Sequence, residues 1–170
     1  MDHETDEAEP VRPEPVTFDI DDRPSSYFFE MAIRFGERTE WIGGSRALAS
    51  PEDALMRAAL TLLAGGSEAE ARMPAENDDS VLALRALPWR EFPYDGGPAG
   101  RACELIWREL DLRTCAVLES RWLGVAASVL QLAEAALALG EAQARRSGPS
   151  AALIALAAAL PAVRAAAPER

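Results

Sequence analysis

The chain has 170 residues, and its content of 49% hydrophobic and 26% charged residues is typical of one folded globular domain. The formal net charge is −11; residues 1–22 hold nine acids against one arginine, or −8, which leaves 16 arginines against 19 acids, or −3, for the rest. This distribution argues against nucleic acid or an anionic membrane as the partner of the whole surface, whereas a basic protein surface stays compatible with it.

The basic residues restrict the chemistry of the chain. All 17 are arginine, and this bias together with the many alanines is typical of a GC-rich, bacterial genome. Without lysine the chain can form neither a Schiff base nor a lysine-containing phosphate loop. The single histidine, His3, lies in the acidic N-terminal segment, so a Ser-His-Asp or Cys-His arrangement has no base in the folded body. We therefore expect no cofactor and favour a protein that is not an enzyme.

The two cysteines, Cys103 and Cys115, match no zinc or redox spacing. On one continuous helix they would lie about 18 Å apart along the axis, too far for a disulfide, so we expect two reduced, buried thiols. The acidic N-terminal segment contains no apolar run of the kind that forms a signal peptide, which predicts a cytoplasmic location.

Residues 1–14 combine acids with proline and are predicted to be a disordered acidic tail, followed by a single α+β domain over 15–170. Apolar and polar residues alternate over 16–21, which predicts a half-buried strand. The same period marks a second strand over 27–35. Its apolar face is formed by Tyr27, Phe29, Met31, Ile33 and Phe35.

The turn after the second strand falls near 36–38. A three-residue loop there pairs Arg34 with Glu40 and Ile33 with Trp41, so that charges meet charges and apolar side chains meet apolar ones. A two-residue loop would instead place Ile33 opposite Glu40. The side-chain chemistry therefore predicts the longer loop.

A helix is predicted to begin at Pro51, with Ser50 as its N-cap, and to end at two glycines, 65–66. The segment 80–87 fits a strand or a short helix, and the turn residues on both sides of it favour a strand. Residues 15–95 are thus expected to be mostly sheet with one helix. The sheet would be a small antiparallel hairpin or meander of three to four strands, packed on helices.

Apolar residues recur at helical spacing from Ala102 onwards, and residues 98–166 are predicted to be helical. We expect a bend or break near Asp111, and the pattern leaves open whether 99–146 holds one helix or two. A turn at 147–150 separates the last helix, over 151–166, and gives an Ala-rich C-terminal helical hairpin.

The last helix contains 13 uncharged apolar residues in a row, whereas a membrane span needs about 20, so no membrane span is predicted. The apolar face of the two C-terminal helices exceeds what a small sheet should cover. This surplus predicts a homodimer through these helices.

Two weak candidates for ion binding can be read from the sequence. Asp19, Asp21 and Asp22, joined by Glu30, resemble a hard-cation site, although Pro24 stands where a calcium loop needs glycine, and turn chemistry alone explains aspartate at a strand end. The second candidate is an anion site. It is formed by Gly97, Gly100 and Arg101 before a predicted helix start.

Aromatic residues form the preferred candidate for partner binding. They are concentrated in the loop 89–95 and include Trp41 on the predicted sheet edge. The partner-binding residues are taken to be Trp89, Arg90, Phe92, Tyr94 and Trp41.

The first functional hypothesis is a non-enzymatic bacterial protein-binding module, analogous at class level to chaperones, adaptors and immunity proteins. The aromatic loop and sheet edge would meet the partner, and the acidic tail would contact a basic surface. One alternative is a divalent-metal-dependent enzyme that uses the aspartate cluster. Another is a small-molecule-binding protein with a pocket between sheet and helices, lined by Phe28, Trp41 and Trp107.

Overall fold

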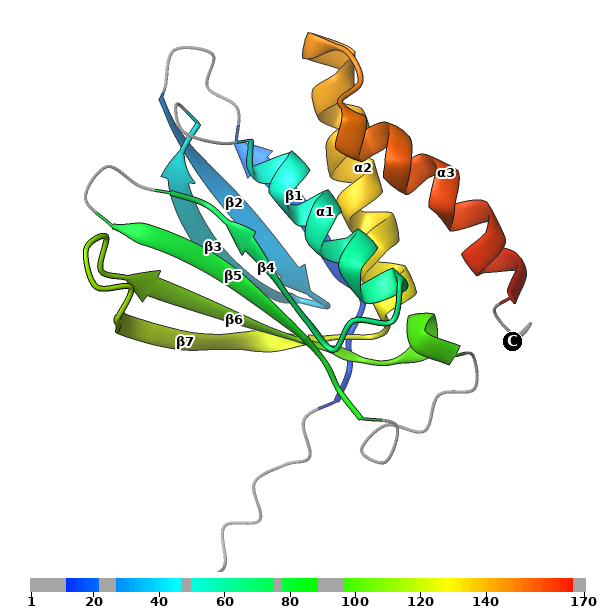
Figure 1. Cartoon of the computed structure of the whole chain (residues 1–170), viewed down its shortest axis with the longest axis horizontal. Coiled ribbons are helices and arrows are strands. Elements are labelled where there is room, and N and C mark those ends of the chain that lie inside the picture. Colours follow the sequence, from blue (N-terminus) through cyan, green and yellow to red (C-terminus); the bar gives the residue numbers. More distant parts are fainter. Residues whose placement is uncertain (1–11, 22–26, 47–49, 75–77, 89–96, 167–170) are drawn as a thin grey trace, which may run out of the picture.

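The computed structural model describes residues 12–21, 27–46, 50–74, 78–88 and 97–166 (Figure 1). A three-stranded and a four-stranded antiparallel sheet pack with three α-helices, the last two of which form a C-terminal pair. The predicted α+β class and the Ala-rich helical hairpin are therefore confirmed.

The three-stranded sheet has the order β1-β2-β3. β1 spans Val16–Asp21, β2 spans Phe28–Phe35 and β3 spans Arg38–Ser45. The alternation in β1 and β2 buries Phe29, Met31, Ile33 and Phe35 on one face, as the period-two pattern predicts. Tyr27 precedes β2 and is exposed.

The predicted register of the β2–β3 hairpin is wrong by one residue. Ile33 lies opposite Glu40 and Phe35 lies opposite Arg38, so the loop has two residues, and its Gly36 adopts a φ of 58°. This left-handed conformation favours glycine and suits a two-residue hairpin loop. The charge of Glu40 is balanced by Arg38, at 2.8 Å, and by Arg121 from a distant strand, at 3.3 Å.

Helix α1, Pro51–Leu63, begins and ends as predicted. The Ser50 hydroxyl accepts a hydrogen bond from the Asp53 N–H at 3.2 Å, which is the expected N-cap. After the helix, Gly65 has a φ of 99°, a conformation that ends helices.

The four-stranded sheet has the order β4-β5-β6-β7. β4, Glu68–Arg72, has no counterpart in the sequence prediction, whereas β5, Asp79–Ala86, confirms the strand expected over 80–87. β6, Cys103–Leu110, and β7, Val117–Ala126, correct the prediction of helices over 98–128. A one-turn 3₁₀-helix, η1, Gly97–Gly100, precedes β6.

The helical prediction fails because apolar residues in β6 fit both periods. Cys103, Leu105 and Trp107 are buried, and the residues between them are half-buried, so both faces of the strand carry apolar side chains. The break expected near Asp111 is the turn of the β6–β7 hairpin. The Asp111 carboxylate accepts hydrogen bonds from the backbone N–H groups of Arg113 and Thr114, both at 2.9 Å.

Helices α2, Val129–Ser147, and α3, Ala151–Ala166, form the C-terminal pair, with Pro161 inside α3. Figure 1 shows α1 and α2 against the sheets and α3 on their outer side. Gly140 of α2 faces Met56 and Leu153, where a larger side chain would meet both neighbouring helices. Within the ranges described, no helix is long and apolar enough to cross a membrane.

Two junctions join the sheets. At the first, Glu14 pairs in parallel with Ala126 of β7, and the Gln131 side chain of α2 both accepts from the Val16 N–H, at 2.9 Å, and donates to the Val16 carbonyl, at 2.6 Å. The side-chain amide of Gln131 thereby forms the two hydrogen bonds that a neighbouring strand would form with Val16. Glu14, the last residue of the segment predicted to be a tail, is thus hydrogen-bonded to the folded body.

At the second junction, β3 crosses the inner face of the four-stranded sheet, which is the face that carries Leu105 and Trp107. Near its start, Arg38 donates to the Leu123 carbonyl of β7 at 2.6 Å, and Arg121 of β7 donates to the Trp41 carbonyl at 2.8 Å. At its end, the Ser45 N–H donates to the Pro74 carbonyl, after β4, at 2.9 Å. β3 therefore runs from β7 towards the β4 side of the other sheet.

One continuous core joins both sheets and all three helices. Its fully buried side chains include Met31, Phe35, Leu55, Leu105 and Leu132. The core ends part of the way along β7, whose first six residues are exposed and whose last four are buried. The β6–β7 hairpin thus projects beyond the core and away from the helices (Figure 1).

Candidate functional site

A cleft of about 480 Å³ lies between β3 and the part of the four-stranded sheet that projects beyond the core. Trp41, Ile42 and Gly43 of β3 form one wall, with Glu30 of β2 beside them. The other wall is the inner face of the larger sheet. It is lined by Asp78, Ser80, Trp107, Glu109, Glu119 and Arg121.

The register of the larger sheet explains which side chains reach the cleft. Ser80 lies opposite Glu109, and Glu109 lies opposite Glu119, so the three residues form one row across β5, β6 and β7. In the next row towards the core, Trp107 lies opposite Arg121. Residues directly opposite one another in an antiparallel pair point to the same face.

The cleft is strongly acidic. Its lining contains four carboxylates and one guanidinium, which sum to −3. Arg121, the cation, is already bound to Glu40 at 3.3 Å and to the Trp41 carbonyl at 2.8 Å. Glu109 and Glu119 form neither an ion pair nor a hydrogen bond with any residue that the structure describes. Like charges directly opposite one another destabilise a sheet, so this pair is unfavourable.

The floor and one wall of the cleft offer further binding groups. Ser80 is only 4% exposed, and over the described ranges its hydroxyl has no hydrogen-bond partner. Trp107 is 8% exposed beside it, whereas Trp41 is 55% exposed at the mouth. Since none of the buried side-chain nitrogen or oxygen atoms in the described residues lacks a partner, the Ser80 oxygen is open to the cleft and can bind a group placed there.

The edge of β3 that borders the cleft is open. In a two-residue hairpin the residues next to the loop form a hydrogen-bonded pair, and such pairs then alternate along the strands. The backbone groups of Trp41, Gly43 and Ser45 therefore point away from β2, as the bonds from Arg121 and to Pro74 confirm. Between these two bonds, the Trp41 N–H and both backbone groups of Gly43 bind nothing in the described chain.

The structure brings three members of the predicted metal cluster onto one face. Asp21 lies opposite Glu30 on the outer face of the three-stranded sheet. On the same face, a carboxylate oxygen of Asp19 lies 3.5 Å from a guanidinium nitrogen of Arg34. Asp22 falls outside the described residues. Among the residues that are described, no group of three or more His, Cys, Asp or Glu side chains is arranged to hold a metal ion.

The predicted anion site is built differently from the expectation. Gly97 and Gly100 bound the short η1 turn, which leads into a strand and not into a helix. The Arg101 guanidinium donates to the carbonyls of Pro98, Leu62 and Gly66 at 2.8–3.0 Å. It thus binds the free carbonyl end of α1, where cations are favoured.

Of the predicted partner-binding residues, Trp41 lines the cleft, whereas Trp89, Arg90, Phe92 and Tyr94 lie outside the described residues. The pocket suggested for a small molecule was expected to be lined by Phe28, Trp41 and Trp107. Trp41 and Trp107 line one cleft, but it lies between β3 and the larger sheet and not between sheet and helices, and its lining does not include Phe28.

The two cysteines differ, contrary to the expectation that both are buried. Cys103 is buried, and desolvation raises the pKa of its thiol to about 12. Cys115 is exposed in the β6–β7 turn with a φ of 56°. Neither lies in the cleft.

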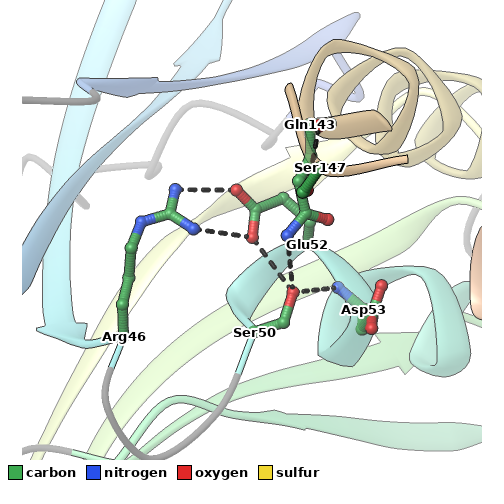
Figure 2. A network of polar contacts seen from close by, with 6 residues as sticks. All are labelled: Arg46, Ser50, Glu52, Asp53, Gln143 and Ser147. Carbon is green, nitrogen blue, oxygen red and sulfur yellow. Dashed lines mark hydrogen bonds and ion pairs between the residues drawn. The ribbon is translucent and has the colours of Figure 1, made fainter. Parts of the chain in front are cut away.

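A second cluster of polar side chains joins the end of β3 to α1 and α2 (Figure 2). Glu52, 2% exposed, binds Arg46 at 2.7 and 3.2 Å and accepts a hydrogen bond from the Ser50 hydroxyl at 3.2 Å. Gln143 of α2 donates to the same hydroxyl at 3.2 Å. The oxygen of Ser50 also caps α1, so these groups are mutually satisfied and the cluster is structural.

Sequence reasoning missed Ser80, Glu109 and Glu119 as site residues. The two glutamates fall in segments predicted to be helical, and that prediction does not place them next to each other. A period-two reading from Cys103 would have placed Trp107 and Glu109 on one face. Comparison of the chain with protein-family models, with curated protein sequences and with solved structures finds no match.

Proposed function

We propose that the protein is a non-enzymatic protein-binding module that holds an extended segment of its partner in the cleft beside β3. The observation that carries this proposal is the cleft of about 480 Å³, which the open backbone edge of β3 borders. An extended segment adds to such an edge through main-chain hydrogen bonds, and pockets beside the edge select its side chains. Chaperones, adaptors and immunity proteins of bacteria are the classes that this activity fits.

Trp41 is the anchor of the proposed surface. It lies on the strand with the open edge, is 55% exposed, and lines the cleft. Exposed tryptophan is enriched among the residues that carry binding energy at protein interfaces. The acidity of residues 1–22 would add attraction to a basic partner over a longer range.

The test is a selection of random 12-residue peptides displayed on phage, with immobilised wild-type protein as the bait. Peptides that bind the cleft should bind Trp41→Ala at least tenfold more weakly when they are synthesised and measured by calorimetry. Trp122→Ala is the matched control, because Trp122 is also exposed, at 46%, but does not line the cleft. Recovery of no peptide, or equal binding to Trp41→Ala, would refute the proposal.

A homodimer through the C-terminal helices is the accompanying proposal. Ile154 of α3 is 60% exposed, and the only charged residue of that helix, Arg164, lies in its last turn. Ile154→Glu should therefore convert a dimer to a monomer in light scattering coupled to size-exclusion chromatography. A wild-type protein that is monomeric at 100-fold dilution and at its stock concentration alike would contradict the dimer.

A further inference from the structure

We infer that the cleft selects a basic side chain, so that the segment bound beside β3 carries an arginine or lysine whose cationic head lies at Glu109 and Glu119. This inference rests on the proposed function and names the chemistry of the partner. It comes from four features of the cleft: its charge, the open hydroxyl of Ser80, its aromatic walls and the adjacent open edge.

The charge of the cleft calls for a cation. Glu109 and Glu119 lie directly opposite each other on β6 and β7, and the nearest cation that lines the cleft, Arg121, is bound to Glu40 and to the Trp41 carbonyl. A guanidinium or ammonium group between the two carboxylates would turn an unfavourable like-charge pair into two charge-assisted hydrogen bonds. The described residues of the protein supply no such group to this pair.

The floor of the cleft points to the same kind of ligand. Ser80 lies in the same row as the two glutamates, and its hydroxyl has no hydrogen-bond partner in the part of the chain that is described and is open to the cleft. Its oxygen can accept a hydrogen bond from an N–H donor of the incoming head group. Arginine and lysine carry several donors and no acceptor, so one head group can bind both carboxylates and the hydroxyl.

The walls of the cleft suit the rest of a basic side chain. Trp107 lies beside the glutamates and Trp41 lies at the mouth, so the methylene stem of arginine or lysine would run along indole surface. Indole rings also attract cations through their π-electrons. A metal ion is a poorer match, because the described residues contain no group of three acids, cysteines or histidines arranged to ligate one.

The open edge of β3 explains why the cation should belong to a peptide. The N–H of Trp41 and both backbone groups of Gly43 face the cleft without partners in the described chain. An extended segment that pairs with them would place alternate side chains towards the inner face of the larger sheet. A basic residue at one of these positions would meet the glutamates.

The closing experiment uses the peptides recovered in the selection described above. Each is synthesised as recovered and again with arginine replaced by citrulline and lysine by acetyl-lysine, both of which remove the charge, and citrulline also keeps the size of arginine. Binding to wild-type protein is measured by calorimetry and by tryptophan fluorescence. We expect the neutral peptides to bind at least tenfold more weakly.

Two matched double variants locate the effect. Glu109→Gln/Glu119→Gln should weaken binding of the basic peptides at least tenfold, whereas Glu68→Gln/Glu70→Gln, with the same change of net charge on β4, should leave it unchanged. The first variant removes the like-charge pair, so its thermal midpoint should equal or exceed that of the wild type. A variant that binds weakly because it is unfolded would be recognised by its circular dichroism.

The outcomes separate this inference from the proposed function. Recovered peptides without basic residues, or neutral peptides that bind as tightly as basic ones, would overturn the inference and leave peptide binding intact. Recovery of no peptide would overturn both. Binding of arginine amide alone as tightly as the peptides would show that the cleft serves a small cation, which contradicts a segment bound along β3.

Discussion

Removal of the Glu52 carboxylate should lower the stability of the whole fold. Glu52→Ala deletes a buried acid that binds the Arg46 guanidinium at 2.7 and 3.2 Å and accepts from the Ser50 hydroxyl at 3.2 Å. Breaking a buried ion pair costs about 3–5 kcal/mol, because the remaining charge loses the carboxylate that compensates it. The Arg46 side chain is 26% exposed and lies 5.9 Å from the Phe29 ring, so it is partly solvated and the lower end applies.

The expected loss for Glu52→Ala is therefore about 3 kcal/mol in the free energy of unfolding. For a chain of this length, 1 kcal/mol shifts the thermal midpoint by about 2–4 °C, which predicts a fall of about 6–12 °C. The assay is urea denaturation followed by tryptophan fluorescence, together with a thermal melt followed by circular dichroism.

Two further variants test the reasoning. Glu141→Ala removes an exposed acid in the middle of α2 and should change stability by no more than about 0.5 kcal/mol. Arg46→Met/Glu52→Leu replaces both partners by apolar groups and should recover much of the loss. A value for Glu52→Ala within about 1 kcal/mol of the wild type would refute the view that this ion pair fixes the start of α1.

Three other predictions concern the junction, the thiols and the hairpin turn. Gln131→Leu leaves the buried N–H and carbonyl at the start of β1 without partners and should cost about 2–4 kcal/mol in urea denaturation; an unchanged midpoint would contradict the strand-like role of this amide. An aromatic disulfide reagent should modify Cys115 in the native protein and Cys103 only after unfolding, because burial raises the pKa of the latter to about 12; two fast-reacting thiols in the native protein would exclude this. The pKa of Asp111 is lowered, chiefly by the hydrogen bond from the Thr114 N–H, so the carboxylate stabilises the fold above its unfolded pKa and loses this effect as the pH falls through its folded pKa. Asp111→Ala should therefore be less stable than the wild type at neutral pH, and the difference should shrink below pH of about 4; a difference that grows in acid would reverse the assignment.

The strands and helices that the sequence predicts well are those with a single periodicity or a clear cap. β1 alternates strictly, β2 departs from alternation only at the buried Ala32, and the first helix has Ser50 and Pro51 at its start, so local chemistry decides the structure there. The C-terminal helices also follow from the turn at 147–150. In these segments the tertiary structure agrees with the local preference.

The segment 103–126 shows why the rest was not predictable in the same way. Cys103, Ile106, Trp107 and Leu110 fit a helical face, yet the chain pairs as a hairpin because β5 offers a partner strand and the core accepts Leu105. The spacing of residues within one segment carries no information about a partner strand elsewhere in the chain. Because the segment was predicted to be helical, the sequence did not indicate that Glu109 and Glu119 lie opposite each other.

The hairpin register failed for a related reason. Pairing Arg34 with Glu40 is the best solution within the hairpin alone. The structure instead pairs Glu40 with Arg38, next to the loop, and with Arg121, which lies 81 residues further along the chain. The candidate cleft depends on the same long-range contact, so Trp41 could be named from the sequence but its partners in the cleft could not.

The two junctions between the sheets should respond differently to ionic strength. The junction at β1 consists of backbone groups and the uncharged amide of Gln131, so dissolved ions barely affect it. The junction at β3 depends on Arg38, Glu40 and Arg121, whose exposed charges are screened as the Debye length falls from about 8 Å at physiological salt to about 3 Å at 1 M. Salt would therefore weaken the contact between the start of β3 and β7 while the junction at β1 stays fixed, and the concentration of ions becomes a means of adjusting how far β3 can move from the larger sheet.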